Sequence, residues 1–247
     1  MKVLVCIDDT DTLGGRGTGH LAALLAEQLT ERGWGKPYPI TRHQLYVHPD
    51  IPYTSHNSAM CFLAEMPEDR VVAFREYAAE FLFKESAAGS DPGLCVAAMD
   101  GILNPNRLIG FGQAAKKRVL TKQEAYALAQ EQGVHLSEHG GTGQGIIGAL
   151  AGVGLRLSGN DGRFRGKYQI VTDSGILSVA DIYARAPVDS VRTEKGRCLS
   201  VQDLVRLGEK VKSVLLNGQS VLLVERDEPG NGTAVWRTIP HERVKKY

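Results

Sequence analysis

Three acidic residues stand together near the N-terminus, directly after a short apolar stretch. Asp8, Asp9 and Asp11 follow Val3–Ile7, whose β-branched and apolar residues are typical of a buried strand. Carboxylates at the end of a strand supply the hard oxygen ligands that Mg²⁺ takes together with phosphate oxygens. Their mutual repulsion is unfavourable unless a cation or N–H donors offset it. The cluster therefore predicts a Mg²⁺ site beside a bound nucleotide, with a solvated acidic turn as the alternative.

A glycine-rich segment follows the carboxylates and leads into a predicted helix. Gly15, Arg16 and Gly17 precede Thr18, and leucines then recur at helical spacing from Leu21 onwards. Because glycines let backbone N–H groups approach a phosphate, this loop is expected to contact the nucleotide. Thr18 is placed to cap the helix, to bind Mg²⁺ or to accept a phosphoryl group, and Arg16 to clamp a phosphate or to remain solvated.

A second glycine-rich segment, residues 139–145, runs into a small apolar stretch. It contains Gly141, Gly143 and Gly145, and Gly148 follows in the apolar stretch. A glycine loop that enters a helix directs N–H groups and the positive end of the helix dipole at an anion. The spacing fits neither a Walker A loop nor the Rossmann fingerprint. Phosphate binding is predicted here, and a tight turn with close helix packing through glycine is the alternative.

Two weaker candidates lie between these segments. Asn57 and His56 follow Ile51-Pro-Tyr in a polar loop. Either residue could contact a ligand, and a plain turn fits the sequence equally well. Lys117 lies in a basic run, 116–118, that could contact phosphate, although such a run is more often a solvated helix face. The four cysteines have no Cys-x-x-Cys spacing and the seven histidines no ligand spacing, which excludes a structural zinc site.

The elements that must position these residues alternate between strands and helices. Apolar patterns predict strands at 46–47 and 58–64 and helices at 71–84 and 122–132, the second behind a capping box of Thr121 and Glu124. This order predicts an α+β fold, a mixed sheet with covering helices and glycine-rich nucleotide loops.

The pattern changes beyond residue 165. Short strands are predicted at 170–171 and 176–179, a short helix at 204–211, and a hairpin at 214–224 around Asn217-Gly218. We therefore expect two domains, 1–165 and a small β-rich C-terminal domain, 166–247.

The composition of the chain is that of a folded protein without a strong overall charge. The 247 residues are 43% hydrophobic, with 29 Lys and Arg against 28 Asp and Glu. Intrinsic disorder and a basic polymer-coating protein are excluded by these values. No signal peptide and no apolar run of membrane-spanning length is found. A cytoplasmic protein without a membrane partner is expected, and the composition leaves its oligomeric state open.

Several blocks of the sequence together resemble the archaeal tRNA(Ile) 2-agmatinylcytidine (agmatidine) synthetases. The blocks are 7–11 with Thr18, 51–53 with Asn57, 92–93, 115–120 with Lys117, and 143–154. Those enzymes use ATP to phosphorylate the anticodon cytidine of a tRNA and replace its C2 oxygen with agmatine. The resemblance covers roughly residues 1–160 and implies a kinase-type ATP-binding domain in 1–165, in a shortened form without the OB-fold and the zinc ribbon.

The resemblance also implies roles for individual residues. Asp8, Asp9 and Asp11 would hold Mg²⁺ and ATP, Thr18 would occupy the position that becomes phosphorylated, and 143–148 would line the nucleotide. Thr18, Asp8 and Asp9 are therefore the expected catalytic residues of an ATP- and Mg²⁺-dependent phosphotransferase, whose acceptor is a nucleoside, a small molecule or a tRNA. A compact tRNA-modifying ligase and a nucleotide-binding regulatory protein without turnover are the alternatives.

Overall fold

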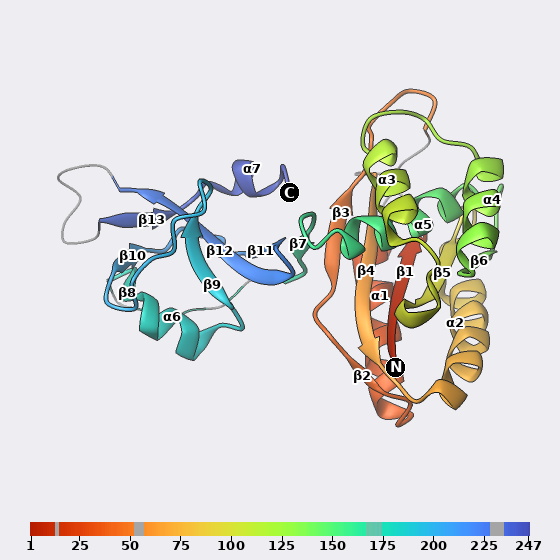
Figure 1. Cartoon of the computed structure of the whole chain (residues 1–247), viewed down its shortest axis with the longest axis horizontal. Helices are drawn as coiled ribbons and strands as arrows, with labels where there is room; N and C mark the ends of the chain where they lie inside the picture. Colours follow the sequence, from red (N-terminus) through yellow and green to blue (C-terminus); the bar gives the residue numbers. More distant parts are fainter. Residues whose placement is uncertain are drawn as a thin grey trace. The chain divides into compact units, whose positions relative to one another are not determined.

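Two compact units make up the chain. The structure, a computed structural model, describes all residues except 13–14, 52–56, 167, 169, 171, 173 and 228–234. The units comprise Met1–Ser158 and Gly159–Tyr247 (Figure 1). The functional domains 1–165 and 166–247 remain a prediction from the sequence.

The first unit is built on an antiparallel sheet. Its strands lie in the order β6-β5-β1-β4-β3, and β2 also pairs with β4. β1 is central and pairs with β4 on one side and β5 on the other. The strands are β1 (Lys2–Asp8), β2 (Lys36–Pro37), β3 (Thr41–Gln44), β4 (Ser58–Glu65), β5 (Gly93–Ala98) and β6 (His135–Glu138).

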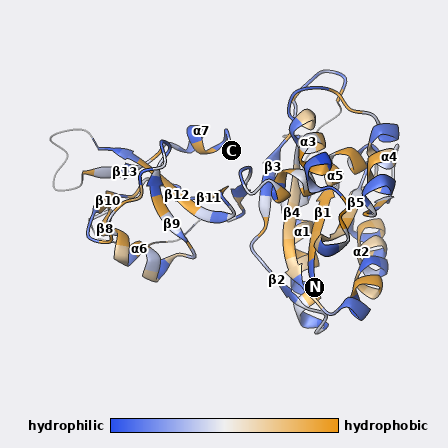
Figure 2. Cartoon of the chain, in the orientation of Figure 1, coloured by the Kyte–Doolittle hydropathy of each residue, from blue (hydrophilic) through white to orange (hydrophobic). Residues whose placement is uncertain are grey.

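Helices cover both faces of this sheet because successive strand residues point to opposite faces. In β1, Val3, Val5 and Ile7 pack against α1 (Thr18–Glu31) and α2 (Val71–Glu85). Leu4 and Cys6 of the same strand pack on the other face. That second core also contains residues of α3 (Pro105–Ala115), α4 (Lys122–Gln132) and α5 (Gly145–Leu157). The layers are visible in Figure 1, and Figure 2 shows the apolar strands between helices with polar outer faces. Short 3-10 helices occupy Glu68–Arg70 and Met99–Gly101.

Local signals located several elements of the first unit correctly. The predicted helix at 122–132 is confirmed as α4, with both hydrogen bonds of the capping box from Thr121 and Glu124 present, and Gly133 (φ 66°) ends it in the left-handed conformation. The helix at 71–84 and the strand at 58–64 are confirmed as α2 and β4.

The strand predicted at 46–47 is wrong. The strand before β4 is β3, at Thr41–Gln44, and Tyr46 lies beyond its end. The backbone N–H of Tyr46 donates to the carbonyl of Ala115 in α3, at 2.9 Å, instead of to a neighbouring strand. β3 escaped sequence analysis because all four of its residues are polar, so it carries no apolar alternation.

The second unit is rich in strands, as predicted. Its strands are β7 (Arg163–Phe164), β8 (Ile176–Ser178), β9 (Ser190–Thr193), β10 (Leu204–Arg206), β11 (Val214–Leu216), β12 (Gln219–Arg226) and β13 (Trp236–Thr238). Two short helices, α6 (Val179–Arg185) and α7 (His241–Val244), accompany them. β9 and β12 are parallel, as are β10 and β13, so the fold class predicted from the sequence, α+β with a mixed sheet and covering helices, is confirmed.

The hairpin predicted around Asn217-Gly218 is confirmed as β11 and β12. Both turn residues have positive φ, 52° and 73°, as a two-residue hairpin turn requires. The helix predicted at 204–211 is wrong, because residues 204–206 form β10, which pairs with β8 and β13. The strand predicted at 170–171 is not formed at Ile170, and Val171 lies outside the described residues.

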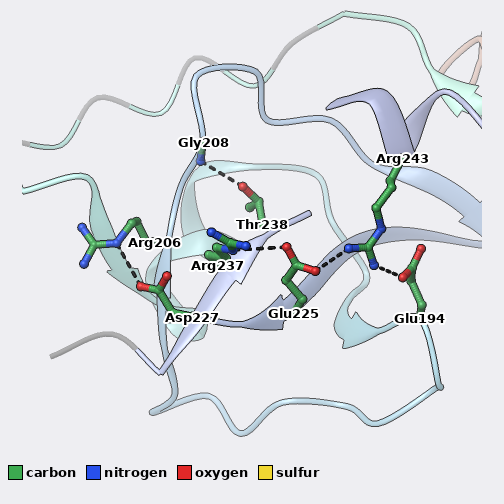
Figure 3. Close-up of polar contacts among 8 residues, drawn as sticks. All are labelled: Glu194, Arg206, Gly208, Glu225, Asp227, Arg237, Thr238 and Arg243. Atoms are coloured by element: carbon green, nitrogen blue, oxygen red, sulfur yellow. Dashed lines mark hydrogen bonds and ion pairs between the residues drawn. The ribbon is translucent and has the colours of Figure 1, made fainter. Parts of the chain in front are cut away.

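A network of ion pairs fixes the last helix of the second unit to its sheet (Figure 3). Arg243 in α7 pairs with Glu225 of β12 and with Glu194, and Arg237 of β13 also donates to Glu225, at 3.1 Å. A separate pair joins Arg206 to Asp227 at 3.0 Å. Each of these charges has an opposite charge beside it, so the network is internally compensated.

None of the helices within the described residues is both long enough and apolar enough to cross a membrane.

Candidate nucleotide site at one edge of the sheet

The strand register gathers the predicted site segments at one edge of the first sheet. Asp8, the last residue of β1, is opposite Gly93, the first of β5, and Gly93 is also opposite Glu138, the last of β6. On the other side, Gln44 at the end of β3 is opposite Ser58 at the start of β4. The acidic loop after β1, the residue before β4, the residues before β5 and the glycine loop after β6 therefore all lie along the same edge.

The Asp8 carboxylate is buried at this edge. Its exposed fraction is 7%, and its Oδ1 accepts a hydrogen bond from the backbone N–H of Asp9 at 2.9 Å. Burial, with the neighbouring charges of Asp9 and Asp11, raises the pKa of Asp8 to about 7. In the ligand-free protein, the ionised form of Asp8 is therefore unfavourable, and a bound cation would stabilise it.

Asp9 is held in an unusual backbone conformation beside two more acids. Its φ is 50°, in the left-handed region that few non-glycine residues adopt. Burial, with the charges of Asp91 and Asp11, raises the pKa of Asp9 to about 6. Strained backbone at a cluster of repelling carboxylates is typical of functional sites, where other contacts compensate for the strain.

Thr18 does not cap its helix through its side chain. It is the first residue of α1, the N-cap position belongs to Gly17, and no side-chain cap hydrogen bond forms. The hydroxyl of Thr18 instead donates to Oδ1 of Asp11 at 3.3 Å and accepts from the backbone N–H of Thr10 at 3.5 Å. Of the roles considered for Thr18, capping through the side chain is excluded, and the hydroxyl donates to the Asp11 carboxylate instead.

The second glycine loop is attached firmly to the start of β5. Asp91 accepts hydrogen bonds from the backbone N–H and from the hydroxyl of Thr142, the latter at 2.6 Å, and its carbonyl accepts from the N–H of Gly145 at 3.1 Å. Lys122 of α4 donates to the Thr142 carbonyl at 2.7 Å and to Glu138. Gly141 and Gly143 have positive φ, 54° and 75°, which explains glycine at both positions.

Close packing also accounts for glycine at several positions in α5. A Cβ on Gly145 would overlap the Asp91 carbonyl, and a Cβ on Gly152 would overlap the sulfur of Cys6. A Cβ on Gly148 would overlap the Asp8 carboxylate. The packing alternative is therefore correct for Gly145 and Gly152, and a substitution at Gly145 would disturb the fold whatever the loop binds. Gly148 differs, because its neighbour is the acidic site itself.

The remaining predicted residues are engaged in other contacts. Arg16 pairs with Glu85 at the end of α2, Nη2 to Oε2 at 2.8 Å, on the surface. The backbone N–H of Gly15 donates to the Thr12 carbonyl at 2.9 Å, which closes a turn. The side-chain amide of Asn57 donates to the carbonyl of Tyr46 at 2.7 Å, so it holds backbone.

Lys117 is exposed just beyond the end of α3, where its backbone N–H donates to the Ala114 carbonyl. Gly14, the Pro-Tyr pair at 52–53 and His56 lie outside the described residues.

Sequence analysis missed two charged residues at this edge. Asp91, whose charge acts on Asp9, stands in the sequence Asp91-Pro92-Gly93 immediately before a buried strand, a signal that could have been recognised. Arg42 lies in the polar strand β3, and its charge acts on Asp8 and Asp11. No pattern in the sequence distinguishes Arg42 from an ordinary surface arginine.

The carboxylates suit Mg²⁺ in chemistry but do not form a ready-made cage. Within the described ranges, no group of three His, Cys, Asp or Glu side chains is arranged to hold a metal ion. Asp8 packs against Gly148 of α5, whereas Asp11 is bonded to Thr18 of α1, so these two carboxylates face different helices. Mg²⁺ commonly takes one or two carboxylates together with phosphate oxygens, and the raised pKa of Asp8 fits a group that awaits such a cation.

The first unit is thus an antiparallel sheet between two layers of helices, with acidic and glycine-rich loops at one edge: an architecture suited to binding a nucleotide. No family model matches the chain. The chain is 30% identical to the tRNA 2-agmatinylcytidine synthetase TiaS of Methanosarcina acetivorans over 159 residues, 63% of this chain and 36% of that protein. It is 33% identical to the TiaS of Archaeoglobus fulgidus over 160 residues, 64% of this chain and 36% of that protein.

Solved structures of TiaS are also similar to this chain. The complex of TiaS with its tRNA and ATP matches with a TM-score of 0.54 and 31% identity, over 62% of this chain and 36% of that chain. Apo TiaS matches with a TM-score of 0.53 and 30% identity, over 62% of this chain and 35% of that chain. The resemblance to the agmatidine synthetases predicted from the sequence is confirmed. The chain spans about a third of the length of the curated relatives it matches.

Proposed function

We propose that the first unit binds ATP with Mg²⁺ at the sheet edge and that the chain is a phosphotransferase related to the agmatidine synthetases. The observation that carries this proposal is the convergence of the acidic loop, Thr18 and the glycine loop of α5 at one edge of the sheet. The structure of TiaS with its tRNA and ATP, which matches 62% of this chain, supports it.

In the proposed arrangement, Asp8 and Asp9 hold the magnesium ion together with phosphate oxygens, and Asp11 shares in holding it. The ion would neutralise charge on the phosphates, which is its usual contribution to phosphoryl transfer. Gly141 and Gly143 would approach the phosphates with backbone N–H groups, whereas the N–H of Gly145 already donates to the Asp91 carbonyl. The helix dipole of α5, which begins at Gly145, favours an anion there.

Thr18 is the proposed phosphoryl acceptor within the protein. Its oxygen would form a bond to the γ-phosphorus while the bond from that phosphorus to the bridging oxygen breaks and ADP leaves. Asp11, which already accepts the hydrogen bond of the Thr18 hydroxyl, would take the proton. The phosphoryl group would then pass to an external acceptor, for which the tRNA in the matching complexes makes an RNA nucleotide the favoured class over a small molecule.

Two alternatives stay open for the same site. A compact tRNA-modifying ligase would use the second unit to hold RNA, and a regulatory protein would bind ATP without turnover. The second unit has 15 Lys and Arg against 11 Asp and Glu, a modest excess that is compatible with RNA.

Product analysis separates these three functions. The full chain is incubated with ATP and Mg²⁺, with and without bulk tRNA, and nucleotides are resolved by chromatography. ADP, with faster turnover when tRNA is present, is the result expected for the phosphotransferase. AMP would indicate the ligase, and ATP that is bound but never cleaved would indicate the regulatory protein. Absence of any ATP binding would contradict all three.

A further inference from the structure

Arg42 is a half-buried cation with which no described residue forms an ion pair. In the part of the chain that the structure describes, its guanidinium makes one hydrogen bond, from Nε to the hydroxyl of Ser58 at 2.9 Å, and no ion pair joins it to Asp8 or Asp11. A buried or half-buried charge is unfavourable unless it is paired or binds a ligand of opposite charge. The Nη groups of Arg42 therefore remain to be explained.

The strand register places Arg42 on the side of the sheet where Thr18 lies. Thr41 is opposite Cys61, whose side chain belongs to the core with α3, α4 and α5. Arg42, the next residue, therefore points to the other face, toward α1, whose first residue is Thr18. Its neighbour Ser58 is on the same face, two residues before Met60 of the α1 core.

The face of the sheet on which Arg42 lies carries further groups that suit a phosphate. On the α1 side lie the N-terminus of a helix of 14 residues and the Thr18 hydroxyl. The charges of Asp8 and Asp11 act on Arg42 without forming an ion pair with it. An arginine fork recognises the oxygens of a terminal phosphate more effectively than a lysine because it donates two parallel hydrogen bonds.

We propose that Arg42 binds the γ-phosphate of ATP and holds it beside Thr18. This inference rests on the proposed function, because it assigns a ligand within the same site. It distinguishes Arg42 from Arg16, for which the sequence left a phosphate clamp and a solvated charge equally open, and which is paired with Glu85. Arg42 is a binding residue for the group that is transferred, and its contribution should differ between nucleotides with and without that group.

The test compares ATP with ADP. Affinities of the full chain for each nucleotide, with Mg²⁺, are measured by calorimetry for the wild type, Arg42→Gln and Arg42→Lys. Arg42→Gln is expected to weaken ATP binding about tenfold or more and ADP binding less than about threefold, because a charge-assisted hydrogen bond to the γ-phosphate is lost. The ATP affinity of Arg42→Lys should lie between those of the wild type and Arg42→Gln, because lysine keeps the positive charge and lacks the two parallel N–H donors of the guanidinium.

Arg107→Gln is the matched control. Arg107 lies on α3, pairs with Glu131 on the surface at 2.9 Å, and is outside the proposed site, so its ATP and ADP affinities should equal those of the wild type. Thermal unfolding separates ligand binding from a structural role. Glutamine keeps a side-chain amide that can donate to the Ser58 hydroxyl in place of Arg42, so Arg42→Gln should unfold at about the same temperature as Arg107→Gln.

Each outcome decides a different point. If the wild type binds no ATP, the proposed function fails and this inference fails with it. If the wild type binds ATP and Arg42→Gln binds it equally well, or loses ATP and ADP affinity to the same extent, only the assignment of Arg42 to the γ-phosphate is overturned. If Arg42→Gln does not fold, the test uses Arg42→Lys instead. An Arg42→Lys variant with the same ratio of ATP to ADP affinity as the wild type would overturn the assignment.

Discussion

Replacing Asp8 by Asn should stabilise the ligand-free protein in a way that depends on pH. The native pKa of Asp8 is about 7, against an ordinary value of 3.8, because the carboxyl is buried among other acids. Below about pH 4 the group is protonated in both the folded and the unfolded chain, so it does not affect the free energy of unfolding. Between about pH 4 and pH 7 only the native state retains the proton, and the stability of the wild type falls as the pH rises.

The size of the effect follows from the difference between the two pKa values. At about 1.4 kcal/mol per pKa unit, ionised Asp8 lowers the free energy of unfolding by up to about 4 kcal/mol at pH 8. Asparagine carries no charge and keeps an oxygen that can accept the Asp9 N–H. Asp8→Asn should therefore unfold at a temperature on the order of 10 °C higher than the wild type at pH 8, and at about the same temperature at pH 4.

The assay is thermal or denaturant unfolding of both proteins from pH 4 to pH 8 without Mg²⁺ or nucleotide. The measured quantity is the difference between variant and wild type, which cancels the titration of groups that do not interact with Asp8. Asp100→Asn, at an exposed carboxylate, is the control, and its difference should stay within about 0.5 kcal/mol at every pH. A difference for Asp8→Asn that does not change with pH, or a less stable variant at pH 8, would refute the electrostatic reasoning.

Three further perturbations test other parts of the site and the fold. Gly148→Ala should abolish Mg²⁺-dependent ATP binding, because its Cβ would displace the Asp8 carboxylate. Gly110→Ala, in open space on α3, is the control and should leave ATP binding intact and gain about 0.5–1 kcal/mol of stability. Equal ATP affinity in the two variants would contradict the role of Asp8. Thr18→Ala should keep ATP affinity within a few-fold yet lose turnover, and Thr18→Ser should stay partly active. γ-Labelled ATP and peptide mapping follow the transfer of the phosphoryl group. Unchanged ATP hydrolysis in Thr18→Ala would remove the catalytic role of Thr18. A thiol reagent should modify Cys198 rapidly and should modify Cys6, Cys61 and Cys95 only after unfolding. Those three thiols are buried, and burial raises the pKa of Cys6 and Cys95. Rapid modification of a second thiol in the native protein, or of any thiol in the native Cys198→Ser variant, would contradict the described core.

The sequence predicts the elements whose signals are local. The capping box at Thr121, the Asn217-Gly218 turn and the apolar strand at 58–64 each depend on a few neighbouring residues, and all three are confirmed. The polar strand β3 and the strand β10 could not be recognised in this way. β3 pairs with β4, the next strand along the chain, and β10 pairs with β8, and neither pairing is recorded in the residues of β3 or β10 themselves.

The site shows the same limit. The acidic loop and the glycine loops were identified because their residue types are unusual, yet the sequence did not distinguish glycine needed for packing, as at Gly145, from glycine beside the acids, as at Gly148. Arg42 could be assigned to the site only once the register had placed β3 beside β4. Arg16 is the converse case, since its partner Glu85 is 69 residues away in the sequence.

The position of the nucleotide is the central claim, and a crystal structure of the chain with Mg²⁺ and a non-hydrolysable ATP analogue tests it most directly. The expected complex has the triphosphate at the sheet edge between the acidic loop after β1 and the start of α5, with Mg²⁺ on Asp8 or Asp9. In it, the γ-phosphate lies within hydrogen-bond distance of Arg42. An analogue bound elsewhere on the chain, or a sheet edge that stays empty at saturating analogue and Mg²⁺, would contradict the account.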